Sequence, residues 1–130
     1  MRYIDVIPTA KDANSRNVGF DTAVIIDVLR ATSVMVTALN NGATKITPAL
    51  TIEDALELKH KSPEVLLGGE RKAEKIDGFD LGNSPLSYTR EKVAGKEIVM
   101  TTTNGTLAIH NSASAQHRYI ACFLNAVQVA

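Results

Sequence analysis

Apolar runs alternate along the chain with amphipathic stretches, a pattern that predicts strands followed by helices. Segment 22–29 reads TAVIIDVL, a β-branched and nearly continuous apolar run typical of a strand buried on both faces of a parallel sheet. The stretch after it, 31–39, predicts a helix that stops at Asn41 and Gly42, because both residue types tolerate the left-handed conformation at a helix end. Strand, tight turn and helix in this order make one βα unit.

The same pattern recurs to the end of the chain. Thr51 and Asp54 form a predicted capping box at the start of a helix, with Asp54 in place of the usual Glu. The predicted helices are 51–59 and about 106–115, with the first turn of another after Asn125, and the further predicted strands are 45–49, 65–69, 97–102 and 118–124. This alternation predicts an α/β fold with a mostly parallel sheet and helices on its faces.

Length and composition predict one globular domain. The chain has 130 residues, of which 45% are hydrophobic and 22% charged, and domains commonly have about 100–150 residues. The last residues begin a helix at Asn125 and carry no stop signal before Ala130. We therefore expect residues 1–130 to be a single α/β domain that forms the amino-terminal part of a longer chain.

The charge balance limits the partners. Lys plus Arg and Asp plus Glu number 14 each, so no net field attracts nucleic acid or an anionic membrane, and any bound anion is held locally. The chain has one cysteine, Cys122, no apolar leader after Met1 and no apolar run near the about 18 residues of a membrane span. We expect a cytoplasmic protein without nucleic-acid or membrane partners.

Candidate chemistry lies at the predicted strand ends, because ligands of open parallel sheets bind beyond the carboxyl ends of the strands. Segment 101–106, TTTNGT, carries hydroxyls, a glycine that allows close backbone approach, and the start of a helix whose N–H groups favour anions. An ordinary tight turn at Asn104 and Gly105, with Thr106 as a cap, fits the same residues. The residues alone leave both interpretations open.

Asp27 lies within an apolar run, and a buried charge is costly unless it is paired or bound to a metal. The alternatives are an ion pair with Arg30 or a cap for the following turn. Arg30 offers a planar fork of donors that suits phosphate, and its alternative is a solvated loop charge. Thr32 and Ser33 add hydroxyls to the same turn.

A second group of polar residues follows segment 65–69 and continues in a long loop. Glu70 and Arg71 come directly after two glycines, and Asp80, Asn83 and Ser84 add oxygen atoms within GFDLGNSP at 78–85. Hard oxygen ligands favour Mg²⁺ over zinc. Asx turns and caps are the alternative role for these loop residues.

Several enzyme classes are disfavoured by missing motifs. The sequence contains neither a GxxxxGK[S/T] nor a GxGxxG motif, which argues against a P-loop NTPase or a dinucleotide enzyme. Leu29 stands where a haloacid dehalogenase-type phosphatase carries its second Asp. The three histidines, His60, His110 and His117, have no metal-ligand spacing and are expected on the surface or in packing roles.

Four motifs together resemble a known family. IDVLRATS at 26–33, LGGER at 67–71, GFDLGNSP at 78–85 and TTTNGT at 101–106 are similar, in order, to the signature blocks of 2-phosphosulfolactate phosphatases. The resemblance extends from about Asp5 to the chain end, whereas family members continue well beyond the equivalent of Ala130. It implies a Mg²⁺-dependent acid phosphatase that hydrolyses 2-phospho-3-sulfolactate to 3-sulfolactate and phosphate, a step associated with coenzyme M biosynthesis.

The residues and the resemblance together lead to one set of predicted roles. Asp27, Arg30 and Glu70 are the predicted catalytic residues, and Asp27, Glu70 and Asp80 the predicted Mg²⁺ ligands. The predicted phosphate and substrate contacts are Arg30, Thr32, Ser33, Arg71, Asn83, Ser84, Thr102, Thr103, Asn104, Gly105 and Thr106. Whether Asp27 attacks phosphorus or positions a water stays open. The alternative functions are a non-catalytic domain that binds a phosphorylated metabolite and an inactive fragment that self-associates as a homo-oligomer.

Overall fold

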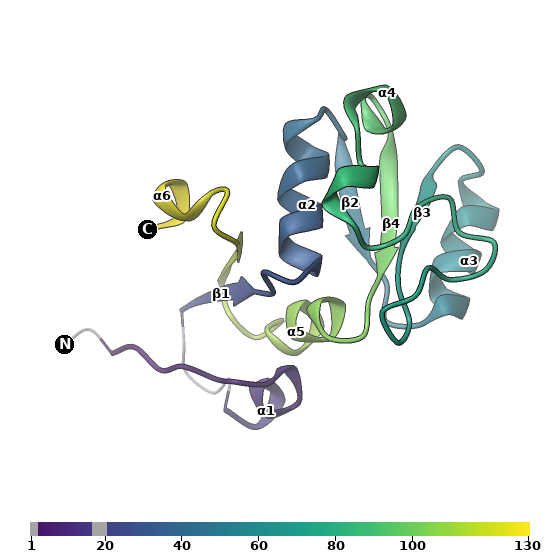
Figure 1. Cartoon of the computed structure of the whole chain (residues 1–130). Helices are drawn as coiled ribbons and strands as arrows, with labels where there is room; N and C mark the ends of the chain where they lie inside the picture. Colours follow the sequence, from purple (N-terminus) through teal and green to yellow (C-terminus); the bar gives the residue numbers. More distant parts are fainter. Residues whose placement is uncertain (1–2, 17–20) are drawn as a thin grey trace.

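A computed structural model describes residues 3–16 and 21–130 and has the predicted α/β architecture of parallel strands flanked by helices (Figure 1). The elements in chain order are α1 (Ala10–Arg16), β1 (Thr22–Ile26), α2 (Ala31–Asn40), β2 (Lys45–Pro48), α3 (Ile52–Lys61), β3 (Leu66–Gly69), the 3₁₀ helix η1 (Pro85–Ser87), α4 (Arg90–Val93), β4 (Glu97–Thr101), α5 (Gly105–Asn111), β5 (His117–Ala121) and α6 (Ala126–Val129). The predicted fold class is confirmed.

The larger sheet has three parallel strands in the order β2-β4-β3, with β4 in the centre. Side chains alternate along β4: Ile98 and Met100 pack with α2, whereas Val99 packs with α3. One helix therefore covers each face of this sheet, as Figure 1 shows for α2 and α3. This arrangement buries β4 on both sides and leads its carboxyl end to the Thr-rich segment.

Strands β1 and β5 form a separate two-stranded parallel sheet within the described part of the chain, where we expected one sheet. The predicted burial of segment 22–29 on both faces is also wrong. Ile25 is buried, but Val24 and Ile26 are 46% and 66% exposed. Ile25 pairs with Ile120, which packs against the α2 core, so this face of the strand is the one directed toward the core. The strand also ends at Ile26 rather than at Leu29.

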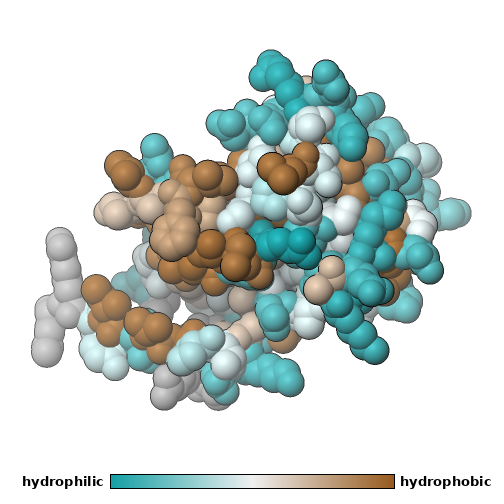
Figure 2. Space-filling view, in the orientation of Figure 1, coloured by the Kyte–Doolittle hydropathy of each residue, from teal (hydrophilic) through white to brown (hydrophobic). Residues whose placement is uncertain are grey.

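Apolar side chains gather on the surface near this smaller sheet. Figure 2, in the orientation of Figure 1, shows them on the left of the molecule, around β1 and α6. Exposed large apolar residues of β5, α6 and the connection between them are Tyr119, Phe123, Leu124 and Val127. Contiguous apolar surface is typical of interaction sites; self-association itself stays a prediction.

Local signals located the helix starts better than the ends. The predicted capping box at α3 is confirmed, because Asp54 N donates to Thr51 Oγ1 at 3.0 Å and Thr51 N donates to Asp54 Oδ2 at 3.2 Å. The helix predicted at about 106–115 instead runs from Gly105 to Asn111. Beyond it the Ser112 hydroxyl donates to Ala108 O at 2.7 Å, and β5 begins at His117.

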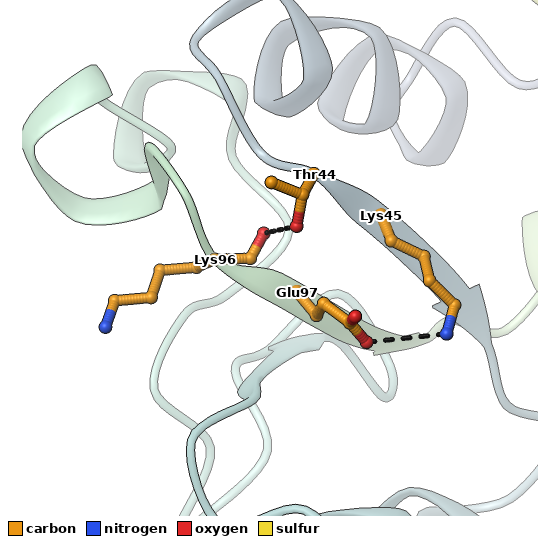
Figure 3. A network of polar contacts seen from close by, with 4 residues as sticks. All are labelled: Thr44, Lys45, Lys96 and Glu97. Carbon is orange, nitrogen blue, oxygen red and sulfur yellow. Dashed lines mark hydrogen bonds and ion pairs between the residues drawn. The ribbon is translucent and has the colours of Figure 1, made fainter.

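Polar contacts at the start of the larger sheet lie on its surface (Figure 3). Lys45 and Glu97 are register partners on β2 and β4, and their side chains form an ion pair of 3.4 Å. The Thr44 hydroxyl donates to Lys96 O at 3.1 Å. Exposed pairs of this kind contribute little stability, so the buried apolar side chains of β4, and not these polar contacts, set the register of the strands.

Among the described helices, none has the length and apolar character needed to cross a membrane.

Candidate active site

The segments that follow β1, β3 and β4 meet around a cavity of about 280 Å³. Its lining residues are Asp27, Leu29, Arg30, Glu70, Lys72, Ala73, Asn83, Thr103 and Asn104. Six of these, all but Leu29, Lys72 and Ala73, are predicted site residues, and they come from segments far apart in the sequence. The cavity therefore lies where the strand-end rule predicts a site.

Asp27 is held by the turn that leads into α2. Its N–H donates to Thr32 Oγ1 at 3.0 Å, and its carbonyl accepts the Thr32 N–H at 3.0 Å. The Ser33 hydroxyl donates to Val28 O at 2.7 Å. Neither Thr32 nor Ser33 lines the cavity, so both hydroxyls shape the turn, and their contact with substrate stays a prediction.

The Asp27 carboxylate sits in an electrostatically unfavourable place for a negative charge. Burial raises its pKa, the Ala31 N–H bound to the carboxylate opposes this effect, and the charge of Glu70 raises the pKa further. No ion pair between Asp27 and Arg30 occurs in the described residues; Arg30 Nη2 donates instead to Ala73 O at 3.4 Å. The alternative of an Asp27–Arg30 pair is therefore wrong for this structure.

Gly105 makes room for that carboxylate. A Cβ at this position would lie 3.1 Å from Asp27 Oδ2 and 2.4 Å from Ala31 Cβ. The bare backbone lets the start of α5 approach both the acid and α2 closely. This is the close approach predicted for Gly105, although the neighbour that the structure shows is Asp27.

Glu70 joins the segments after β3 and β4. Its Oε1 accepts the Thr103 N–H at 2.6 Å, and its Oε2 accepts the Ala73 N–H at 2.8 Å and the Thr103 hydroxyl at 3.1 Å. Burial alone would raise its pKa, but these donors and the nearby Arg71 charge outweigh burial and lower it. Glu70 is thus an ionised side chain whose hydrogen bonds link two loops of the cavity.

Glu70→Gln is expected to destabilise the protein by about 1–3 kcal/mol at pH 7, because an amide nitrogen cannot accept the N–H that the carboxylate accepts. A lowered pKa contributes stability above the ordinary value of 4.5, and that stability is lost as the pH falls through the folded-state pKa. Urea unfolding of the wild type and of Glu70→Gln should therefore give a difference in the free energy of unfolding that becomes smaller below about pH 4.5. A difference in the free energy of unfolding that does not depend on pH would contradict an ionised, hydrogen-bonded Glu70.

Three predicted residues between β3 and β4, namely Arg71, Asp80 and Ser84, do not line the cavity. Arg71 donates to Glu70 O at 2.9 Å, Leu50 O at 3.0 Å and Thr101 Oγ1 at 2.7 Å, so backbone and hydroxyl oxygens take the guanidinium predicted for phosphate. Asp80 Oδ2 accepts the Leu67 N–H at 2.8 Å and lies 3.9 Å from Lys59 Nζ, which places this predicted Mg²⁺ ligand beside β3. Ser84 caps η1 without a side-chain hydrogen bond.

The Thr-rich segment divides into two parts. Thr102 and Thr106 are buried and bind each other: Thr106 N donates to Thr102 Oγ1 at 3.1 Å, and Thr106 Oγ1 donates to Thr102 O at 2.8 Å. These two residues follow the tight-turn alternative. Thr103 and Asn104 are exposed and line the cavity, whereas Gly105 is buried and does not line it. Thr103 and Asn104 are therefore the part of the predicted anion site that the structure leaves accessible.

Asn83 adds a polar atom that the protein itself does not satisfy. The residue is 8% exposed and lines the cavity, yet within the described residues its Oδ1 has no hydrogen-bond donor. A buried acceptor without a partner is costly. An unpaired oxygen beside two carboxylates suits a cation or a hydroxyl-bearing ligand.

Lys72 is the charged residue that the sequence analysis missed. It lines the cavity beside Arg30 and brings a second cation to it. Its position in the run GGERK, directly after the predicted site residues Glu70 and Arg71, is the sequence feature that could have indicated it. Strand position alone gives no reason to prefer Lys72 over Arg71, since the choice depends on the turn that follows β3.

A larger cavity of about 460 Å³ adjoins this one and shares Asp27 and Asn104 with it. Its other walls are β1, α5 and the segment before α1. Its charged lining residues are Asp5 and Asp27, both acids. An anionic ligand therefore fits the smaller cavity, which holds both cations.

Comparison with known proteins identifies the family of this chain. A model of the 2-phosphosulpholactate phosphatase family matches residues 7–130. The chain belongs to this family. Curated relatives named "Probable 2-phosphosulfolactate phosphatase" include those of Clostridium novyi, 50% identical over 128 residues, and Clostridium acetobutylicum, 51% identical over 128 residues. A third, from Clostridium perfringens strain 13, is 52% identical over 131 residues.

These matches cover nearly all of this chain but only part of each relative. The Clostridium novyi and Clostridium acetobutylicum alignments take in 98% of the chain and 54% of the relative, and the Clostridium perfringens alignment 98% and 53%. The chain thus spans about half the length of the 2-phosphosulfolactate phosphatase relatives it matches. The resemblance to this family is thus confirmed, and each of the four motifs contributes residues to the lining of the smaller cavity.

The cavity of this 2-phosphosulfolactate phosphatase family member offers a donor set that fits Mg²⁺. No group of three or more His, Cys, Asp or Glu suited to a metal occurs in the described residues. Mg²⁺, however, is commonly held by one or two carboxylates together with water and substrate phosphate. Asp27, Glu70 and the unpaired Asn83 Oδ1 provide oxygen donors of this kind. Asp80, beside β3, is not one of them.

Proposed function

We propose that this chain carries the substrate site of a Mg²⁺-dependent phosphatase that hydrolyses 2-phospho-3-sulfolactate, or a similar phosphorylated acid, to 3-sulfolactate and phosphate. One observation supports this most strongly: two carboxylates, two cations and the exposed residues Thr103 and Asn104 line one small cavity. Family membership supports phosphatase chemistry, since the relatives carry that name. Coenzyme M biosynthesis and a cytoplasmic location belong to the same proposal.

The residues divide the work of hydrolysis between them. Arg30 and the side-chain amide of Asn104 bind the phosphoryl oxygens, because a guanidinium and an amide N–H donate hydrogen bonds that stabilise spread negative charge. Asp27 faces the same space with a raised pKa, which suits a group that takes a proton from attacking water. Glu70 holds the loops in place through Thr103 and Ala73.

The chemical step is a displacement at phosphorus. Water forms a new bond to phosphorus, the bond between phosphorus and the ester oxygen breaks, and the proton from water ends on the released hydroxyl. Mg²⁺ bound by Asp27, Glu70 and Asn83 would neutralise charge that develops on the phosphoryl group. Direct attack by Asp27 on phosphorus remains the second route to the same products.

Phosphate release tests the proposal. The chain is incubated with 2-phospho-3-sulfolactate and Mg²⁺, with a chelator, and with Mg²⁺ restored after chelation. We expect release that the chelator abolishes and added Mg²⁺ restores. Calorimetric binding of the substrate without any release would instead support the non-catalytic binding domain, and unchanged release in the chelator would overturn the Mg²⁺ dependence.

A further inference from the structure

The turn after β3 has a conformation that its residues do not favour. Arg71 and Glu74 pair through two backbone hydrogen bonds, with Arg71 N to Glu74 O at 3.0 Å and Glu74 N to Arg71 O at 3.1 Å. Lys72 and Ala73 form the two-residue loop between them, with φ angles of +53° and +66°. Two-residue turns with positive φ at both positions strongly prefer Asn and Gly. The sequence uses neither.

Positive φ is costly for a residue with a Cβ, and such strained residues concentrate at functional sites. The other positive-φ residues of the described chain are glycines: Gly42, Gly69, Gly78 and Gly95. The strain at Lys72 and Ala73 is held in place by Glu70, whose carboxylate accepts the Ala73 N–H at 2.8 Å. A glycine at position 72 would ease the turn but remove the ammonium from the cavity.

Lys72 shares its side of the cavity with Arg30. Arg30 Nη2 donates to Ala73 O, so the guanidinium lies against the same turn. No ion pair involves Lys72 in residues 3–16 and 21–130, and its side chain is exposed. Asp27 and Glu70 are more buried than Lys72 and lie beside the Thr103 segment. Lys72 thus supplies a positive charge at the exposed side of the cavity.

We propose that Lys72 determines substrate specificity by binding the acid group of the substrate that is remote from its phosphate. That group is a sulfonate or a carboxylate, which an ammonium binds as a point charge. The proposal rests on the proposed function, because it takes the Asp27 side of the cavity as the phosphate position. It goes beyond that function by giving the second acid group its own cation.

Binding measurements separate this role from a general charge effect. Calorimetry on the full chain compares 2-phospho-3-sulfolactate with isopropyl phosphate, which has no second acid group. Lys72→Met should weaken binding of the sulfonated compound about tenfold and change isopropyl phosphate less than about twofold, because only the former loses a charge-assisted contact. Lys72→Arg should retain most of the affinity. Lys75→Met, which removes an exposed lysine outside this cavity, should leave both affinities unchanged.

Stability measurements separate charge from strain. Lys72→Gly and Ala73→Gly should each raise Tm by about 3 °C, because glycine accepts positive φ. Lys72→Met keeps the strain and should leave Tm unchanged. Loss of sulfonated-ligand affinity in both Lys72→Gly and Lys72→Met supports the proposal. Equal losses for both ligands, or wild-type affinity in Lys72→Met, would overturn it, whereas failure of the wild-type chain to release phosphate bears on the proposed function alone.

Discussion

Asp27→Asn is expected to lower phosphate release by about a thousandfold, because an amide neither accepts a proton from attacking water nor carries the negative charge that favours a cation. The Asn side-chain oxygen can still accept the Ala31 N–H that the carboxylate accepts. The turn into α2 should therefore stay intact. The loss then reports on chemistry rather than on folding.

The same substitution is expected to stabilise the protein at neutral pH. Burial and the Glu70 charge raise the Asp27 pKa, so its favourable contribution is present below the ordinary value of 3.8 and is lost as the pH rises through the folded-state pKa. At pH 7 the ionised side chain is a cost that a neutral amide removes. Asp77→Asn, on an exposed loop residue outside the cavity, is the matched control.

Phosphate release and thermal unfolding of the two variants check this pair of effects. Asp77→Asn should match the wild type in both. Wild-type release by Asp27→Asn would remove Asp27 from the catalytic residues. A lower Tm in Asp27→Asn would contradict the electrostatic account of its environment.

Gly69→Ala is expected to destabilise the fold by at least about 3 kcal/mol, because backbone strain and a backbone clash act together. Gly69 has a φ of +135°, and a Cβ there would lie 1.8 Å from Thr101 O. Relief of this clash requires β3 and β4 to move apart. That movement would break the hydrogen bond from Glu70 N to Thr101 O at 3.0 Å and displace the Glu70 carboxylate.

Gly95→Ala provides the control for backbone strain without a clash. Gly95 has a φ of +72°, but no heavy atom lies within 4 Å of the position of an added Cβ. Its cost should be about 1 kcal/mol. Urea unfolding of both variants measures the difference, and similar losses would show that close approach of β3 to β4 contributes nothing at Gly69.

The sequence by itself determined the order of the five strands, the helices α2, α3 and α5 between them, and the location of the candidate site. Capping at Thr51 and the β-branched run after Thr22 are local signals, so they could be interpreted without knowledge of neighbours. The strand-end rule needs only the order of strands. It was therefore sufficient to select Asp27, Glu70 and Thr103, which the fold brings to one cavity.

Tertiary structure alone decided which adjacent polar residue faces that cavity. Glu70 lines it, whereas Arg71, one residue later, binds Leu50 O and Thr101 Oγ1. Neighbouring side chains leave an extended backbone in different directions, and the partners that hold each one come from distant segments. Sequence distance contains neither piece of information.

The same reason explains Asp80, Lys72 and the exposed face of β1. Asp80 accepts a hydrogen bond from the Leu67 N–H, and Lys72 lines the cavity because of a turn with positive φ. Ile26 lacks a covering element in the described residues. Each outcome depends on contacts between segments far apart in the chain. Local pattern thus determined the elements and the edge where chemistry is expected, and long-range packing decided which side chains meet there.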